Sequence, residues 1–318
     1  MPGKITIFVA AMLELILLLE NAVMPQINKN PKYPAGERLI DQINIQIDEP
    51  VDLAVLVVKQ TGIRCKLISS QLPVTYRTVN RDVEGEVITV IPSKIWQFKN
   101  TVYMSGETID RRLDIEALDL TPLGIKEVGM FQPDETELLD DNDPYKKYYL
   151  PIIAYGPRKM YEMEQVLPFY DPDSLEDDPI SKSVDAFQDG DNEAGFKILK
   201  DLLAEDLRCI DAHVHLGNWD FNHTNGKLPY ETLIRYEVGV KIAELSIDGD
   251  FNGLLPWDHI SNRPYLRCLY GYGLSLWRMG NNEAARLIFE KMLWLNPKDN
   301  QDIRSLLAEI DAGNCWQE

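Results

Sequence analysis

Residues 270–297, YGYGLSLWRMGNNEAARLIFEKMLWLNP, decide the fold of the second half of the chain. Gly280 separates two amphipathic stretches, each of helical period and length. Gly273 falls within the first stretch, while Ala285 and Phe289 lie four residues apart on the second. Two helices that cross closely need a small side chain at their contact and larger apolar groups beside it. The segment therefore predicts a tightly packed helical hairpin.

The same pattern occurs twice more, upstream of this segment. DAFQDGDNEAGFKILKDLLAEDL (185–207) and HLGNWDFNHTNGKLPYETLIRYEVGVKIAEL (215–245) each predict a helix, a glycine-bearing turn and a second amphipathic helix. Aligning the three units gives one small position (Ser183, Gly217, Gly273), a second (Gly195, Thr232, Ala285) and a large apolar position (Leu199, Tyr236, Phe289). Residues 246–264 are extra and interrupt the regular spacing. Residues 300–313 predict one final helix, which would cap such an array.

This arrangement resembles the tetratricopeptide repeat, a helix–turn–helix unit with small, small, aromatic and proline residues at these offsets. The resemblance covers residues 181–312. It implies stacked helix pairs whose first helices line a concave groove that binds a peptide or a partner's helix. The whole chain also looks like uncharacterised bacterial repeat proteins of the cytoplasm, and that likeness implies a cytoplasmic location.

The first half of the chain has the period of β-strands. Short β-branched runs are separated by turn residues, namely 43–48, 51–58, 63–68, 74–79 and 86–91. Residues 92–107 predict a further hairpin around Asn100, and 113–118 a short helical piece. We therefore expect an α+β protein with a mixed or β-rich module at 1–130 and an all-α repeat domain at 181–318.

Two acidic, proline-bearing stretches lie between these halves. Residues 133–144 contain six carboxylates and residues 171–179 contain five, with no basic residue in either. Neither stretch has the spacing of a calcium loop. The sequence therefore predicts a solvated linker over residues 131–180.

Composition excludes several classes of partner. The 318 residues include 51 acidic and 32 basic side chains, a net charge of −19 that disfavours binding to nucleic acid or an anionic membrane. The four cysteines are scattered, which is typical of reduced thiols. The apolar segment Ile5–Leu19 is 15 residues long, shorter than the ~20 that span a bilayer, so a buried element is favoured over membrane insertion.

We expect a non-catalytic interaction scaffold with no cofactor and no metal, whose partner is a protein or a peptide. The repeat register places six candidate partner-binding residues in the groove: Asn218, Asn222, Arg267, Tyr270, Trp277 and Arg278. Asparagine amides hold a peptide backbone, arginine binds a carboxylate, and aromatic rings supply contact area.

The alternative function is that of a metal-assisted hydrolase. Residues 211–215, DAHVH, resemble the DxHxH opening of amidohydrolase barrels, in which two histidines bind zinc. Only about a hundred residues follow His215, too few for such a barrel. The motif also falls in a predicted helix, where side chains two residues apart point in different directions. The sequence therefore favours a core position for His213 and a pairing of His215 with Asp211.

Overall fold

The computed structural model describes residues 39–316 except 44, 60–61, 79–81, 134–141, 172–177, 225–226 and 248. The chain divides into two compact units, Met1–Gln42 and Ile43–Glu318. Of the first unit, only the short helix α2 (Leu39–Gln42) is described. The segment Ile5–Leu19 and its predicted burial therefore lie outside the described residues.

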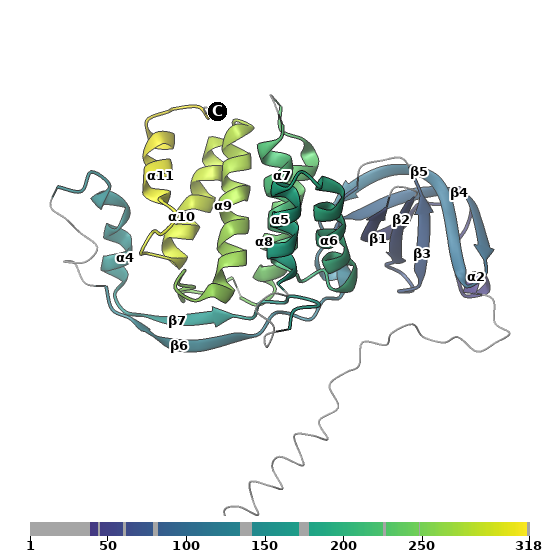
Figure 1. The fold of residues 1–318 in the computed structure, drawn as a ribbon, viewed down its shortest axis with the longest axis horizontal. Coiled ribbons are helices and arrows are strands. Elements are labelled where there is room, and N and C mark those ends of the chain that lie inside the picture. The colour runs from purple at the N-terminus through teal and green to yellow at the C-terminus, as the bar shows by residue number, and fades with distance from the viewer. Residues whose placement is uncertain are drawn as a thin grey trace, which may run out of the picture. The chain divides into compact units, whose positions relative to one another are not determined.

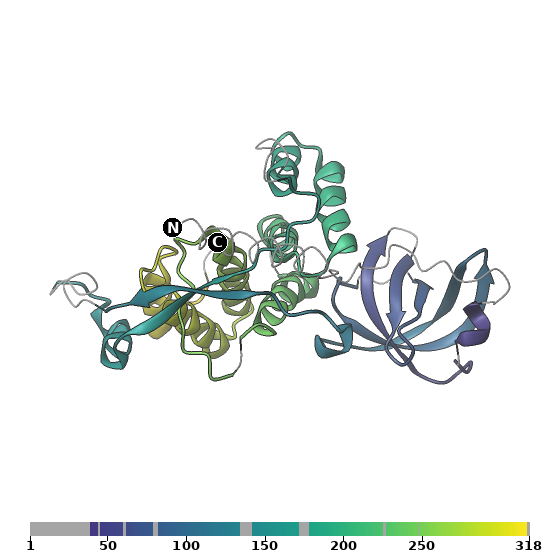
Figure 2. The ribbon, with the colours of Figure 1, turned by 90° about the horizontal axis from the view of Figure 1, so that it is seen from below.

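Five strands of the second unit form a closed barrel in the order β1-β2-β3-β5-β4 (Figures 1 and 2). They are β1 (Val51–Lys59), β2 (Gly62–Leu67), β3 (Pro73–Arg77), β4 (Val87–Phe98) and β5 (Thr101–Arg112). Neighbouring strands are antiparallel except β3 and β5, which run parallel. The β-rich prediction is confirmed here, including the hairpin around Asn100.

The strand predicted over residues 43–48 is wrong. None of its described residues belongs to a strand, and Ile47 remains 45% exposed. Asp48 adopts a left-handed backbone with φ of 69°, which breaks an extended conformation. Its amide donates to the Pro92 carbonyl at 3.0 Å, a single bond rather than a ladder. The alternating isoleucines of this segment therefore do not form a strand, because no neighbouring strand among the described residues pairs with them.

The region predicted as a linker contains regular structure. After the 3-10 turn η1 (Glu116–Leu118), strand β6 (Ile125–Phe131) pairs antiparallel with β7 (Arg158–Met163). Between these strands lie the turn η2 (Lys146–Tyr148) and helix α4 (Leu150–Tyr155). The linker prediction is therefore wrong for residues 145–163, because the β7 strand finds its partner in β6, about thirty residues earlier. The central parts of both acidic stretches lie outside the described residues.

The extra residues 246–264 connect β7 to the helices. Leu254 forms a parallel bridge with Met160, with backbone bonds of 2.8 Å and 2.9 Å to the neighbouring residues of β7. The buried amide of Asn262 accepts a hydrogen bond from the Met163 backbone and donates to the carbonyls of Tyr161 and Pro256. The insertion therefore anchors the β6–β7 hairpin to the helical part.

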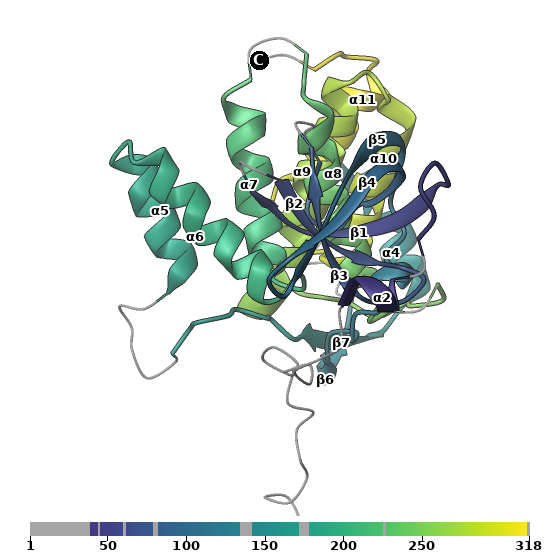
Figure 3. The ribbon, with the colours of Figure 1, turned by 90° about the vertical axis from the view of Figure 1, so that its right-hand side faces the viewer.

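Three helix pairs and a final helix complete the fold. They are α5 (Pro179–Gln188) with α6 (Asn192–Glu205), α7 (Ile210–Asn222) with α8 (Tyr230–Glu244), α9 (Arg263–Arg278) with α10 (Asn282–Leu295), and α11 (Ile303–Asp311). α9 packs against both α7 and α8, whereas α5 and α6 form a pair beside α7 (Figure 3). The side chains of Asp178, Asp191 and Asn281 cap α5, α6 and α10.

Small residues lie where these helices cross. A methyl group added to Gly273 would lie 2.6 Å from a ring carbon of Phe289, and one added to Gly217 would lie 2.8 Å from the ring of Tyr236. Gly271, on the opposite side of Tyr236, would bring a methyl group to 2.2 Å. The aromatic rings therefore fill the space that the glycines leave, as the sequence predicts for close helix packing.

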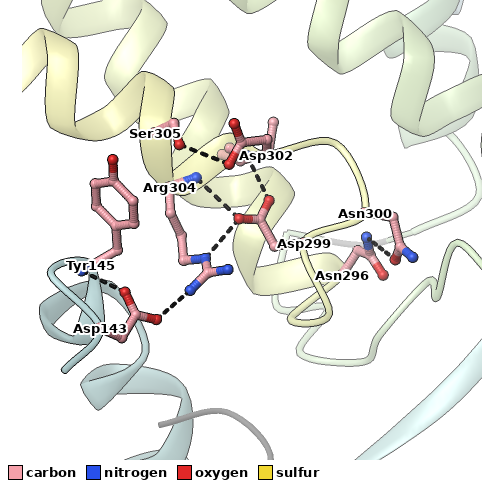
Figure 4. Close-up of polar contacts among 9 residues, drawn as sticks. Asp143, Tyr145, Asn296, Asp299, Asn300, Asp302, Arg304 and Ser305 are labelled. Atoms are coloured by element: carbon pink, nitrogen blue, oxygen red, sulfur yellow. Dashed lines mark hydrogen bonds and ion pairs between the residues drawn. The ribbon is translucent and has the colours of Figure 1, made fainter. Parts of the chain in front are cut away.

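The turn between α10 and α11 is held by a network of polar side chains (Figure 4). The carboxylate of Asp299 caps α11, because it accepts hydrogen bonds from the backbone amides of Ile303 and Arg304. It also accepts one from the Arg304 guanidinium. The same guanidinium donates to Asp143 at 2.6 Å. A residue before α4 is thereby joined to the last helix.

Candidate functional site

Two neighbouring helices, α7 and α9, present most of the residues that the sequence predicts for partner binding. Asp211, His215, Asn218 and Asn222 follow one another at intervals of three or four residues, which places them on one side of α7. Arg267, Tyr270, Leu274 and Arg278 do the same on α9. We call these eight residues the first-helix face. Of the predicted residues, Asn218 and Asn222 are exposed, while Arg267 and Tyr270 are half-buried.

A buried carboxylate holds one end of this face together. Asp211 is only 4% exposed, and it accepts hydrogen bonds from Gln165 at 2.7 Å and from Arg267 at 3.3 Å. Burial raises the pKa of Asp211, and the positive charge of Arg267 opposes that rise. The guanidinium of Arg267 also lies over the ring of Trp257, 5.6 Å from its centroid. Arg267 is therefore positioned by an acid and an aromatic ring at once.

The two histidines of the metal motif do not share a site. Helix α7 contains both, as the sequence predicts, and His213 is fully buried with its Nε2 donating to the Leu207 carbonyl at 3.1 Å. Burial lowers the pKa of His213 to about 4. Burial also lowers the pKa of His215, while the nearby Asp211 raises it. No group of three His, Cys, Asp or Glu side chains within the described residues could hold a metal ion.

The middle of the first-helix face is supported from behind by a tyrosine of α8. The Tyr236 ring lies between Gly217 of α7 and Gly271 of α9. Its hydroxyl donates to the side-chain oxygen of Asn218 at 2.7 Å. Because the Asn218 Oδ1 accepts that bond, its Nδ2 group acts only as a donor, and within the described residues it has no partner.

Trp277 and Arg278 are engaged within the chain, which corrects the prediction that both are freely available: a partner could contact Trp277 only after residues 314–316 are displaced. Trp277 is 7% exposed, its indole N–H donates to the Asn314 carbonyl at 3.1 Å, and its ring meets Trp316 edge-on with centroids 5.6 Å apart. Arg278 donates to the carbonyls of Phe221 (2.9 Å) and Thr224 (2.6 Å), at the end of α7.

Sequence reasoning missed the aromatic cluster of Phe221, Trp277 and Trp316. Trp316 contacts Phe221 edge-on at 5.5 Å as well as Trp277, so it lies against both α7 and α9. Its only sequence signal is a tryptophan three residues after Gly313, which ends the last helix with φ of 75°. A single tryptophan after the end of a helix does not show which side chains it will contact.

Comparison with known proteins does not assign this chain to a family. No protein-family model matches this chain, and no curated protein or solved structure is significantly similar to it. Within the described residues, no helix combines the length and the apolar character that crossing a membrane requires.

Proposed function

We propose that this protein is an interaction protein, without chemistry of its own, whose helix pairs form a tetratricopeptide-like array. Three consecutive helix pairs followed by α11 support this assignment. So does the packing of Gly217 and Gly273 against the large side chains that the repeat register pairs with them. In such arrays the first helices of successive pairs receive an extended peptide.

The observation that carries the proposal is the contact of residues 314–316 with α7 and α9. These residues have no regular secondary structure, yet they place an aromatic side chain against two helices and accept a hydrogen bond through a backbone carbonyl. Trp316 is half-buried there, and an aromatic side chain packed into a helical groove is a common anchor in peptide recognition. The segment therefore occupies the position that a partner peptide with a tryptophan or similar aromatic anchor would take.

The first-helix face suits the remainder of such a peptide. Asn218 and Asn222 offer amide groups to a peptide backbone, and Arg267 offers a guanidinium to a carboxylate. Tyr270 adds a half-buried ring between them. The aromatic site at Trp277 and the first-helix face together therefore offer a peptide one anchor position and a row of polar contacts.

The test supplies the segment in trans. A fluorescein-labelled peptide of residues 312–318, with serine at 315, is titrated into the full chain carrying Trp316→Ala while anisotropy is measured. We expect saturable binding, and binding at least about tenfold weaker to the wild-type chain, because a tethered segment competes at millimolar effective concentration.

Two controls make the experiment decisive. A peptide with alanine in place of the tryptophan should not bind, and Trp277→Ala added to the Trp316→Ala chain should abolish binding of the original peptide. Circular dichroism confirms that each variant is folded. If the folded Trp316→Ala chain shows no binding of the peptide up to about 1 mM, or binds both peptides equally, then the aromatic site does not bind peptides.

A further inference from the structure

A cleft between α6 and the barrel carries a charge opposite to that of the chain. Its volume is about 650 Å³, and its walls come from β1 and β2 on one side and from α6 on the other. Five cationic side chains and two carboxylates line it, whereas the whole chain has 32 basic against 51 acidic residues. This local reversal of charge is the feature that an anionic ligand would recognise.

Three of the five cations are unpaired. Lys197 bonds to Asp201 one turn further along α6, and Arg235 bonds to Glu84 and Asp220. Within the part of the chain that the structure describes, Lys59, Arg64 and Lys200 form no ion pair and no hydrogen bond through their side chains. Lys59, Arg64 and Lys200 come from three different elements, β1, β2 and α6, and they face the same space.

Close packing between the barrel and the helices fixes the walls of the cleft. Glu84 accepts a hydrogen bond from the Val58 amide at 3.2 Å and forms an ion pair with Arg235 of α8 at 3.2 Å. A methyl group added to Gly85 would lie 2.5 Å from the Val238 side chain, so the backbone of the barrel touches α8 directly. A cleft with fixed walls loses little entropy when a ligand binds.

The cleft is partly apolar, which suits a peptide better than a single small anion. Val57, Val58, Phe196 and Ala204 contribute apolar surface between the charges. A second cavity of about 430 Å³ shares Arg64, Asp201 and Ala204 with the first and continues past them. Among the described residues, Arg64 is the one basic residue that lines the second cavity, beside Asp201 and Glu205, so only the first cavity carries an excess of positive charge.

We propose that this cleft, here called the cationic cleft, binds an acidic peptide segment of a partner protein. Lys59, Arg64 and Lys200 would pair with successive carboxylates, while the aliphatic parts of glutamate side chains would pack on Val58 and Phe196. The site is separate from the first-helix face, so it can be present or absent whatever binds there.

The experiment uses the full chain and labelled hexaglutamate, with labelled hexaglutamine as the uncharged comparison. Fluorescence anisotropy at low ionic strength should show binding of hexaglutamate only, with an affinity that falls as salt is added. The variant Arg64→Ala/Lys200→Ala should weaken that binding by about tenfold or more. A matched variant, Lys126→Ala/Lys227→Ala, removes the same charge elsewhere and should leave binding unchanged.

Three outcomes would overturn the proposal. Wild-type protein that fails to bind hexaglutamate has no such site, and equal weakening by both double variants would assign the binding to net charge alone. Inorganic phosphate or citrate that displaces hexaglutamate at equal concentration would identify a small-anion site instead. Thermal unfolding of the variants distinguishes loss of binding from loss of folding.

Discussion

Replacing the buried carboxyl group of Glu86 by the amide of glutamine should change how stability depends on pH. Glu86 precedes β4, is fully buried, and accepts a hydrogen bond from the Val83 amide at 2.6 Å. The pKa of Glu86 is raised to about 7, mainly by burial and also by the nearby carboxylate of Asp82, while the hydrogen bond from the Val83 amide and the charge of Arg111 oppose the rise. The folded protein therefore binds this proton more tightly than the unfolded chain, where the pKa is 4.5.

The sign and size of the effect follow from this difference. Stability from Glu86 is fully present below pH 4.5, is lost as the pH rises toward 7, and is constant above that. Because one pKa unit corresponds to about 1.4 kcal/mol, the total loss is about 3 kcal/mol. About 2.5 kcal/mol of it falls between pH 5 and pH 8, a range above the isoelectric point near 4.6 where the protein stays charged.

Urea unfolding at several pH values between 5 and 8 measures this loss directly. The free energy of unfolding of Glu86→Gln, minus that of the wild type, should grow by about 2.5 kcal/mol across the range. Glu107→Gln, an exposed glutamate of β5, is the control and should give a difference that varies by less than about 0.5 kcal/mol. A Glu86→Gln difference that stays constant with pH would refute the raised pKa and the burial argument behind it.

Three further predictions concern the helical part. Because burial lowers the pKa of His213 to about 4, its contribution to stability is present above pH 6.5 and is lost as the pH falls toward 4. In urea titrations, the free energy of unfolding of the wild type minus that of His213→Gln should therefore rise by about 2 kcal/mol from pH 5 to pH 8. Gly273→Ala should lower the free energy of unfolding by about 1–3 kcal/mol, because the new methyl group overlaps Phe289, whereas Gly249→Ala, which meets nothing within 4 Å, should change it by less than about 0.5 kcal/mol. Asp299→Ala removes the cap of α11 and should cost about 1–2 kcal/mol by thermal or urea unfolding, whereas Asp299→Asn, which keeps an acceptor, should cost less.

The sequence predicted the helices of residues 179–311 well because their signals are local, but it missed α4. Glycines at the ends of helices, such as Gly280, and apolar residues at helical spacing lie in or next to the element that they specify. The barrel is different, because β3 pairs with β5 rather than with the next strand along the chain. No local pattern encodes that pairing, so strand positions were predictable and the closed topology was not.

The candidate site shows the same division. Spacing placed Asn218, Asn222, Arg267 and Tyr270 on one face, and the structure brings them onto neighbouring helices. The same spacing fits a buried core residue, so it could not distinguish Trp277, which is covered by a segment nearly forty residues away. The cationic cleft was also beyond sequence reasoning, because its cations are spread over more than 130 residues and only the packing of α6 on β1 gathers them.

Residues 143–158 join α10 and α11 to an earlier part of the chain. Asp143 bonds to Arg304, Lys147 and Tyr148 both bond to Asp311, and Arg158 donates to a carbonyl of α10. Stacked repeats that touch only their neighbours fray from their ends, and their outermost amides exchange with solvent first. Here α11, the last described helix, is bonded to residues 143–148, so its amides should be protected from exchange until those side-chain contacts also break.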